Sequence, residues 1–293
     1  MEEKYRIITH AGKAHLDELV ACALLAVSRG TQPFEIIRQE NRVTEALIKE
    51  NALQEKDWVL DCGMEYDPSR RLYDHHQDGE LPSAALLIFN EFFPELQGSR
   101  LHDSLMLLSR VDTGGIQSLN DYGSLDESGS YCSFSQKLLL KGFELDPSDA
   151  VRMVSEALKD SIEFEHMRNK ALVWLENKEH TEVVEIEGVK VLAYRVQPPE
   201  ELASALRSAD KEMVDEQKIG AVFSFDEKNP AGRALFRTGH GLGFLDFSHC
   251  RPSETIFCHP GGFLLKFEPA REDEWLRLVR ESLVSQSSDS EES

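Results

Sequence analysis

ITHAGKAHLDEL, residues 8–19, is the stretch that decides how the first part of this chain folds. A short apolar run leads into His10, His15 and Asp17, which are three side chains able to bind metals or protons. Either a buried strand carries these groups to the edge of a sheet, or the stretch is a polar turn that happens to hold two histidines. The apolar segment that follows, residues 16–27, has the periodicity of a largely buried helix and favours the first interpretation.

Strand-like and helix-like segments alternate from residue 4 to residue 175. The predicted strands are 5–9, 34–38 and 58–63, and the predicted helices are 16–27, 42–50, 82–93 and 101–111. Strands that are separated by helices predict an α/β fold, with a mostly parallel sheet that carries helices on both faces.

The chain changes character further on. Residues 120–133 are rich in Gly, Ser and Asp and predict a loop. From residue 183 strand-like runs dominate, with helical segments around 200–214 and 272–284. We therefore predict four parts: an N-terminal α/β domain over 1–135, a helical connector over 136–178, a smaller C-terminal α/β domain over 179–285, and a disordered acidic tail over 286–293.

The composition is that of a globular protein, with 41% hydrophobic residues. No apolar run approaches the roughly 18 residues that a membrane span needs, and the N-terminus resembles neither a signal peptide nor a transit peptide. The five cysteines, an odd number without regular spacing, do not predict a disulfide framework. These features predict a cytoplasmic protein, with the nucleus as the alternative, and no membrane partner.

The net charge of −21 restricts the kinds of nucleic acid that the chain is expected to bind. Tight, sequence-independent binding of a duplex depends on Lys and Arg side chains that neutralise phosphates, so such an activity is disfavoured. The charge does not exclude an enzyme that grips a short nucleotide substrate through metal ions.

Four histidines and four aspartates of the first domain are candidate metal ligands: His10, His15, Asp17, Asp61, Asp74, His75, His76 and Asp112. Most of them lie at the ends of apolar elements, and ligands of open α/β sheets bind beyond the carboxyl ends of the strands. Imidazole and carboxylate without thiolate suit Mn²⁺, Zn²⁺, Fe²⁺ or Mg²⁺. Carboxylates can bridge two ions about 3.5–4 Å apart, the geometry that activates water for phosphoryl transfer. The alternatives are that single aspartates, Asp17 in particular, only cap helices and that the paired histidines lie at the surface.

Three motifs resemble the DHH phosphoesterase superfamily and, in more detail, its MYG exonuclease (melanocyte proliferating gene) branch. They are THAGKAHLDELVA at 9–21, LDCGMEYDP at 60–68 and YDHHQ at 73–77. In the C-terminal half, IFCHPGGF at 256–263 is similar to a late segment of that branch. The resemblance implies a DHH-type first domain and hydrolysis of phosphodiester or phosphoanhydride bonds with two metal ions, typically Mn²⁺, with Mg²⁺ or Zn²⁺ as alternatives.

The resemblance also implies a role for each candidate. The first ion would be held by His10, His15 and Asp61. The second ion would be held by Asp17, His75 and Asp112, with Asp61 as the bridge. The two catalytic candidates are His76, which would face the substrate phosphate or the leaving oxygen, and Asp74, which would orient a histidine.

A mobile second domain that faces the metal site and supplies substrate selectivity is expected from the superfamily resemblance. Its candidate substrate-binding residues lie in GRALFRTGHGLG and CHPGGF: Arg233, Arg237, His240, His259, Gly261 and Gly262. Glycine lets backbone N–H groups approach phosphate closely, and arginine binds phosphate in a fork geometry. The alternative is a β-turn whose polar groups are satisfied within the turn.

The leading hypothesis is a divalent-metal-dependent phosphoesterase, namely a 3′-to-5′ exonuclease that acts on short RNA or single-stranded DNA. A rival at the same site is a small-molecule phosphatase that acts on pyrophosphate, a dinucleotide or a nucleotide. A rival of another class is a non-catalytic metal-binding regulator. The negative charge, and the lack of a basic stripe interleaved with aromatic residues, favour short substrates.

Overall fold

The computed structural model describes residues 4–114, 134–226 and 228–284. The chain divides into two compact units, Met1–Glu165 and His166–Ser293, and helix α6 (Pro147–Glu176) contributes residues to both. The domain boundaries at 135 and 178 stay predictions. The loop predicted at 120–133 and the acidic tail predicted at 286–293 lie outside the described residues.

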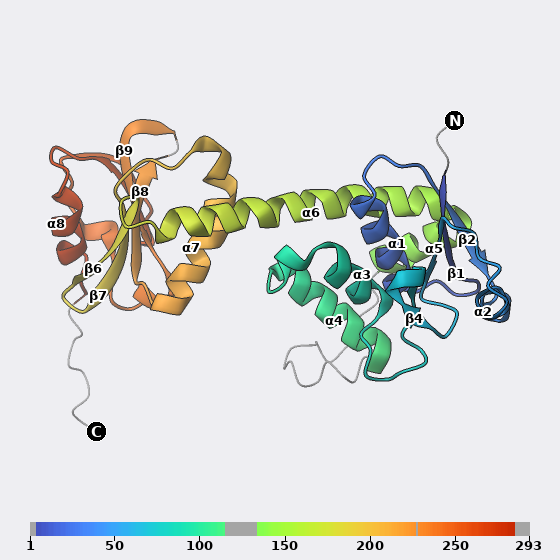
Figure 1. The fold of residues 1–293 in the computed structure, drawn as a ribbon. Coiled ribbons are helices and arrows are strands. Elements are labelled where there is room, and N and C mark those ends of the chain that lie inside the picture. Colours follow the sequence, from blue (N-terminus) through green and yellow to red (C-terminus); the bar gives the residue numbers. More distant parts are fainter. Residues whose placement is uncertain (1–3, 115–133, 227, 285–293) are drawn as a thin grey trace, which may run out of the picture. The chain divides into compact units, whose positions relative to one another are not determined.

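The first unit is built around a five-stranded sheet with the strand order β2–β1–β3–β5–β4 (Figure 1). The strands are β1 Tyr5–His10, β2 Phe34–Gln39, β3 Asp57–Leu60, β4 Tyr66–Asp67 and β5 Leu72–Tyr73. All neighbouring strands pair in parallel except β4, which is antiparallel to β5. The α/β fold and its mostly parallel N-terminal sheet, both predicted from the sequence, are confirmed.

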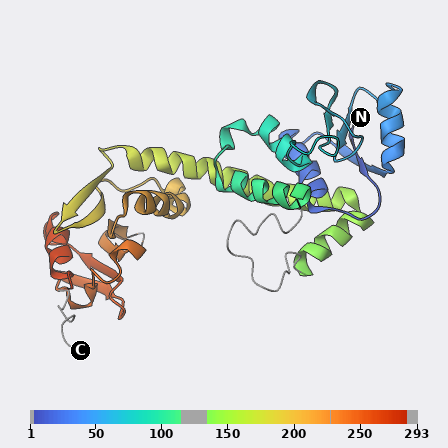
Figure 2. The same cartoon turned by 90° about the horizontal axis from the view of Figure 1, so that it is seen from below.

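Helices cover both faces of this sheet. Successive side chains of a strand point to opposite faces, so each strand contributes residues to two cores. Ile7 and Leu60 enter one core, whereas Ile8 and Val59 enter a second, smaller core. The larger core is closed by α1 (Leu16–Ser28), α3 (Ala84–Phe92), α4 (Arg100–Gly114), α5 (Phe134–Leu145) and the first part of α6. The smaller core is closed by α2 (Asn41–Lys49), which lies on the other side of the strands in Figures 1 and 2.

Helix α1 begins and ends at points that its sequence marks. The Glu18 carboxylate accepts a hydrogen bond from the backbone N–H of His15 at 3.4 Å, as in a capping box. The run of alanine and leucine that follows has high helix propensity, and most of it is fully buried. After the helix, Gly30 adopts a φ of 65°, a conformation that glycine takes without steric cost.

The second unit contains a six-stranded sheet with the order β10–β11–β9–β8–β7–β6. The strands are β6 Thr181–Ile186, β7 Val189–Tyr194, β8 Ala221–Asp226, β9 Asn229–Arg237, β10 Glu254–Cys258 and β11 Leu264–Glu268. Neighbours are antiparallel, apart from the parallel pair of β7 and β8. Helix α7 (Ala203–Gln217) and the end of α6 pack on one face, and α8 (Glu274–Glu281) packs on the other (Figure 1).

Among the described residues, no helix has both the length and the apolar character that crossing a membrane requires.

Candidate metal centre

Three neighbouring parallel strands of the first unit end at the candidate site. His10 is the last residue of β1, Asp61 directly follows β3, and Asp74 directly follows β5. The carboxyl ends of adjacent parallel strands lie at one edge of a sheet, so these side chains meet there. Strand β5 has only two residues, too few for an alternating pattern, and it was not predicted from the sequence. This short strand nevertheless brings Asp74 and the two histidines after it to the site.

The structure brings together all eight candidate ligands of the first unit. They form three overlapping groups, and within each group the potential ligand atoms lie within 4.8 Å of one another. The groups are His10, His15 and Asp61; Asp17, Asp61, His75 and Asp112; and Asp61, Asp74, His75 and His76. Asp61 belongs to all three. Its φ of 55° is uncommon for a residue other than glycine and is the kind of backbone strain that clusters at functional sites.

Five buried ligand atoms in this cluster have no hydrogen-bond partner among the described residues. They are Nε2 of His10, Oδ2 of Asp17, Oδ1 and Oδ2 of Asp61, and Nε2 of His75. Nε2 of His75 lies 3.2 Å from one Asp61 oxygen and Nε2 of His10 lies 3.6 Å from the other, without hydrogen-bond geometry. A shared cation would give these buried atoms a common partner. Imidazole nitrogen and carboxylate oxygen form the ligand set of borderline and hard divalent cations. The residues therefore fit divalent metal ions.

Asp17 fits both roles considered for it, that of a helix cap and that of a metal ligand. Its Oδ1 atom accepts hydrogen bonds from the Ser83 hydroxyl and, at 3.1 Å, from the backbone N–H of Ala85, so it caps the start of α3. Its Oδ2 atom is buried and unpartnered among the described residues. One oxygen therefore stabilises a distant helix, while the other is free to bind a cation.

Asp61 and the two histidines beside it shift one another's pKa values. Burial alone would raise the pKa of Asp61, but His10 and His75 outweigh it and lower that pKa to about 2. Burial alone would lower the pKa of each histidine. Neighbouring carboxylates reverse this effect and raise the pKa of His10 to about 9 and that of His75 to about 10. Without metal, the two histidines therefore hold protons that balance the carboxylates.

Asp17 shows the opposite shift. Burial raises its pKa well above the ordinary value, and the nearby carboxylates of Asp61 and Asp112 add to the effect. A divalent cation would supply the positive charge that bound protons otherwise provide here, so metal binding is expected to release protons.

The Asp74 side chain holds the backbone around His75 and His76 in place. Its carboxylate accepts hydrogen bonds from the backbone N–H of Met64 at 2.6 Å and of His75 at 2.7 Å. The Nδ1 atom of His76 lies 2.6 Å from the same carboxylate. The His76 side chain is 45% exposed, and Asp74 thus orients an imidazole that solvent can reach.

Two residues around His10, Glu18 and Arg38, were not predicted from the sequence. Glu18 is fully buried, and its Oε2 atom lies 3.2 Å from Nε2 of His10. Arg38 at the end of β2 forms an ion pair with Glu18 at 3.2 Å. Glu18 is not among the predicted site residues, although it directly follows Asp17 in the motif. Arg38 carries no local signal, since only the parallel pairing of β1 and β2 brings it to the site.

In the second unit, the turn between β10 and β11 holds three predicted substrate-binding residues, His259, Gly261 and Gly262, and Arg237 at the end of β9 contacts this turn. Arg237 donates to the Gly261 carbonyl at 3.4 Å, and Nδ1 of His259 accepts from the Gly261 N–H at 3.0 Å. Gly262 has a φ of 62°, and a Cβ atom there would collide with the Asp246 carboxylate. The β-turn alternative therefore describes the backbone correctly. The Arg237 guanidinium, however, has no carboxylate within ion-pair distance among the described residues.

The other two predicted substrate-binding residues make different contacts. Arg233 lies over the ring of Phe225, 4.1 Å from its centroid, on the wall of a hollow of about 470 Å³. His240 lies 3.2 Å from Asp215, which belongs to α7. Neither contact connects Arg233 or His240 to the turn between β10 and β11.

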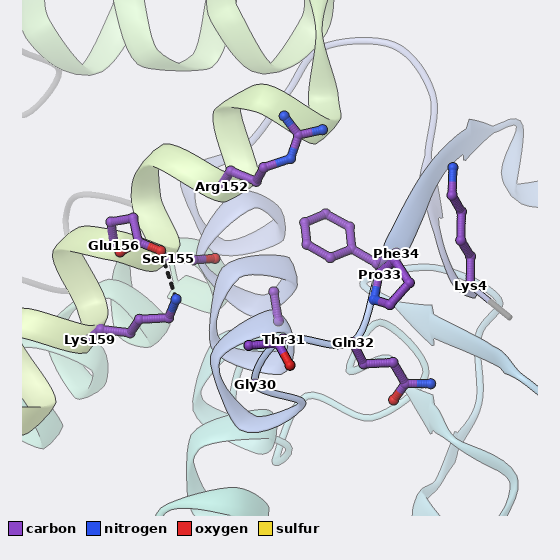
Figure 3. Close-up of a pocket in the computed structure, with 11 residues that line it drawn as sticks. Lys4, Gly30, Thr31, Gln32, Pro33, Phe34, Arg152, Ser155, Glu156 and Lys159 are labelled. Atoms are coloured by element: carbon purple, nitrogen blue, oxygen red, sulfur yellow. Dashed lines mark hydrogen bonds and ion pairs between the residues drawn. The ribbon is translucent and has the colours of Figure 1, made fainter. Parts of the chain in front are cut away.

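A further hollow, of about 360 Å³, lies at the opposite, amino-terminal edge of the first sheet (Figure 3). It is lined by the segment between α1 and β2 and by polar residues of α6. Those residues are already paired, Glu156 with Lys159 at 2.6 Å and Arg152 with Asp149. None of the eight candidate ligands lines this hollow.

Comparisons with known proteins find similarity to one family. Residues 6–94 match the MYG1_exonuc family model, described as an uncharacterised protein family (UPF0160). The human protein named MYG1 exonuclease is 43% identical over 72 residues, which cover 25% of this chain and 17% of that protein. The MYG1 protein of Chlamydia trachomatis is 29% identical over 130 residues, 43% of this chain and 41% of that protein. The MYG1 protein of Dictyostelium discoideum is 27% identical over 168 residues, 49% of this chain and 48% of that protein.

The chain thus spans less than half the length of each of these relatives. The match to the MYG1_exonuc family model lies in the first part of the chain. All the candidate ligands except Asp112 lie inside the matched residues 6–94.

Proposed function

We propose that the chain is a divalent-metal-dependent phosphoesterase of the DHH type, and specifically a 3′-to-5′ exonuclease on short RNA or single-stranded DNA. The observation that carries the proposal is the set of five unsatisfied ligand atoms at the carboxyl edge of a parallel sheet. The exonuclease names of the mammalian relatives support the same chemistry. We further propose that 136–178 act as a helical connector and that 179–285 form a substrate-binding domain.

The proposed centre has two ion sites that share Asp61. His10 and His15 would complete one site, and Asp17, His75 and Asp112 would complete the other. Mn²⁺ is the proposed metal, with Mg²⁺ or Zn²⁺ as alternatives that the ligand set also suits. When bound, two such ions supply hydroxide near neutral pH and stabilise the charge on the attacking and leaving oxygens.

Two contacts of the histidine side chains support these proposed roles. Nδ1 of His10 lies 3.0 Å from the Ala11 carbonyl oxygen, a contact that directs Nε2 toward Asp61. The bond to Asp74 likewise occupies Nδ1 of His76 and leaves Nε2 available to substrate. The same bond raises the pKa of His76 above its ordinary value and so favours the protonated ring. His76 would therefore act as the general acid that protonates the leaving oxygen.

A row of rings in the second unit supports a nucleic acid substrate rather than a small molecule. Ring centroids are 6.4 Å apart from Phe257 to His259, 3.9 Å from His259 to Phe263, and 6.1 Å from Phe263 to Phe236. Phe236 is 46% exposed and Phe257 is 45% exposed. Half-exposed rings offer stacking surfaces for unpaired bases, and Arg237 beside them would bind a phosphate.

The three hypotheses are separated by one assay. Metal-free protein is supplied with Mn²⁺ and incubated with RNA oligomers labelled at one or the other end, with dinucleotides and with pyrophosphate. Stepwise shortening from the 3′ end is the expected result. Turnover of small substrates alone would favour the small-molecule phosphatase, and Mn²⁺ binding without any turnover would favour the regulator. A cytoplasmic location, with the nucleus as the alternative, stays a prediction.

A further inference from the structure

The metal centre adjoins a buried ion pair to which the proposed reaction gives no role. Arg38 donates to both oxygens of Glu18, from Nε to Oε1 at 3.2 Å and from Nη2 to Oε2 at 3.3 Å. The Thr9 hydroxyl also donates to Oε1, at 2.9 Å. The Glu18 side chain is fully buried and that of Arg38 is 11% exposed. A carboxylate so far from water requires such a charge partner to remain ionised.

The pair is fastened to the loop that connects His10 and His15. Arg38 Nη2 donates to the Gly12 carbonyl at 3.4 Å, and Glu18 Oε2 accepts from the His15 N–H at 3.4 Å. Each member of the pair therefore holds one point of the loop. The two histidines at its ends are the proposed ligands of one ion.

Helix α5 supports the pair and the loop from a second direction. The buried ring of Phe143 lies 5.0 Å from the Arg38 guanidinium carbon. The next residue, Glu144, accepts a hydrogen bond from the Ala14 N–H at 3.2 Å. The loop is thus held between α5 and the Arg38–Glu18 pair, which leaves the two histidines little freedom to separate.

The ligands of the other proposed ion are held by different parts of the unit. Asp17 is fixed by the start of α3, His75 by Asp74, and Asp112 belongs to α4. None of the hydrogen bonds of Arg38 among the described residues reaches these three side chains.

We propose that Arg38 is a positioning residue for one of the two ions, the one held by His10 and His15, and that the other ion does not depend on it. The inference rests on the proposed two-ion centre. Arginine suits the role because its planar fork reaches both Glu18 oxygens and the Gly12 carbonyl together, whereas a lysine ammonium is a single point of charge. Partners of this kind typically change metal affinity about 10–100-fold.

The test is a calorimetric titration of the metal-free full chain with Mn²⁺. Arg38→Gln should weaken one ion about 10–100-fold and leave the other unchanged, with a smaller loss in Arg38→Lys. The control is Arg42→Gln, which removes an exposed pair with Glu40 and should match the wild type. In RNA hydrolysis, Arg38→Gln should raise the Mn²⁺ concentration for half-maximal rate by the same factor. Saturating Mn²⁺ should restore kcat, and KM for RNA should stay constant.

Other outcomes overturn the inference. Two ions bound to Arg38→Gln with wild-type affinities, or both ions weakened equally, would show that Arg38 does not position one site. If circular dichroism shows Arg38→Gln to be unfolded, Arg38→Lys decides, and wild-type binding of both ions by that variant overturns the inference. A wild-type chain that binds no Mn²⁺ contradicts the two-ion centre itself, and the inference fails with it.

Discussion

The Nε2 atom of His75 lies 3.2 Å from Oδ1 of Asp61, and neither atom has a hydrogen-bond partner among the described residues. The other carboxylate oxygen of Asp61 lies 3.6 Å from Nε2 of His10. Asp61 therefore stands between two imidazoles, with one oxygen turned toward each. The proposed two-ion centre assigns Asp61 to both ions, and this position suits that assignment.

Metal affinity should rise with pH. Without metal, the pKa values of His10 and His75 are about 9 and about 10, so both rings are protonated near neutral pH. Each ring must lose its proton to bind an ion, and apparent affinity should therefore rise at least about tenfold per pH unit for each ion below pH 9. Mn²⁺ titrations at pH 6.5 and 8.5 measure this rise. Affinities that do not change with pH would contradict the assignment of these histidines as ligands.

The metal-free protein should show the opposite dependence in its stability. The pKa of His75 is about 10 in the fold against an ordinary 6.5, so the proton binds the folded state more tightly. Its contribution to the free energy of unfolding is complete below about pH 6.5 and is lost as pH rises to about 10. Urea denaturation in a chelator should therefore show falling stability across this range, and saturating Mn²⁺ should remove the decline. A constant or rising stability in the chelator would be inconsistent with protonated histidines beside Asp61.

His76→Ala should separate catalysis from metal binding. The variant removes the proposed general acid, and hydrolysis should fall about 10²–10⁴-fold. Both ions should remain bound, and the free energy of unfolding should fall by less than about 1.5 kcal/mol, the net worth of one hydrogen bond. Activity assays, metal analysis and denaturation of the same preparation test these three statements. Loss of bound metal would reassign His76 as a ligand.

The row of rings in the second unit, formed by Phe236, Phe257, His259 and Phe263, should affect RNA binding but not metal content. Stacking of one base on an aromatic ring is worth about 1–3 kcal/mol, so Phe236→Ala should raise KM for RNA oligomers about 5–150-fold. Phe244→Ala is the matched control, because Phe244 is equally exposed at 46% and makes no contact with the row's rings among the described aromatic pairs. Arg237→Gln should also raise KM without loss of Mn²⁺. Equal KM values for the two Phe variants would remove the row from the substrate path.

Much of the first unit follows from its sequence because its signals are local. Apolar runs end at His10 and Asp61, and the alternation of strands and helices is enough to predict that both lie at one sheet edge. Asp112 was expected to follow its helix at residue 111, but α4 continues to Gly114 and Asp112 lies in its last turn. One further turn of helix extends a periodic segment without a sequence signal of its own.

The remaining features depend on contacts between distant segments. Ser83 donates to Asp17 across 66 residues of chain, and Arg38 reaches Glu18 because β2 pairs with β1. The ring row likewise joins Phe236 of β9 to residues of the β10–β11 hairpin. No spacing in the sequence encodes such pairings, so the surroundings of the site could not be predicted, whereas the candidate ligands could be named from their motifs.

The most direct measurement is the number of Mn²⁺ ions bound per chain, determined together with RNA hydrolysis in wild type and Asp61→Asn. The control is Asp78→Asn, which alters an exposed aspartate near the same edge. We expect two ions and turnover for the wild type and the control. For Asp61→Asn, which keeps the shape of the side chain but removes its charge, we expect a loss of bound metal and a fall in rate of more than about 100-fold, beyond the usual effect of an indirect partner. Asp61→Asn protein that retains two ions and wild-type turnover would contradict the account.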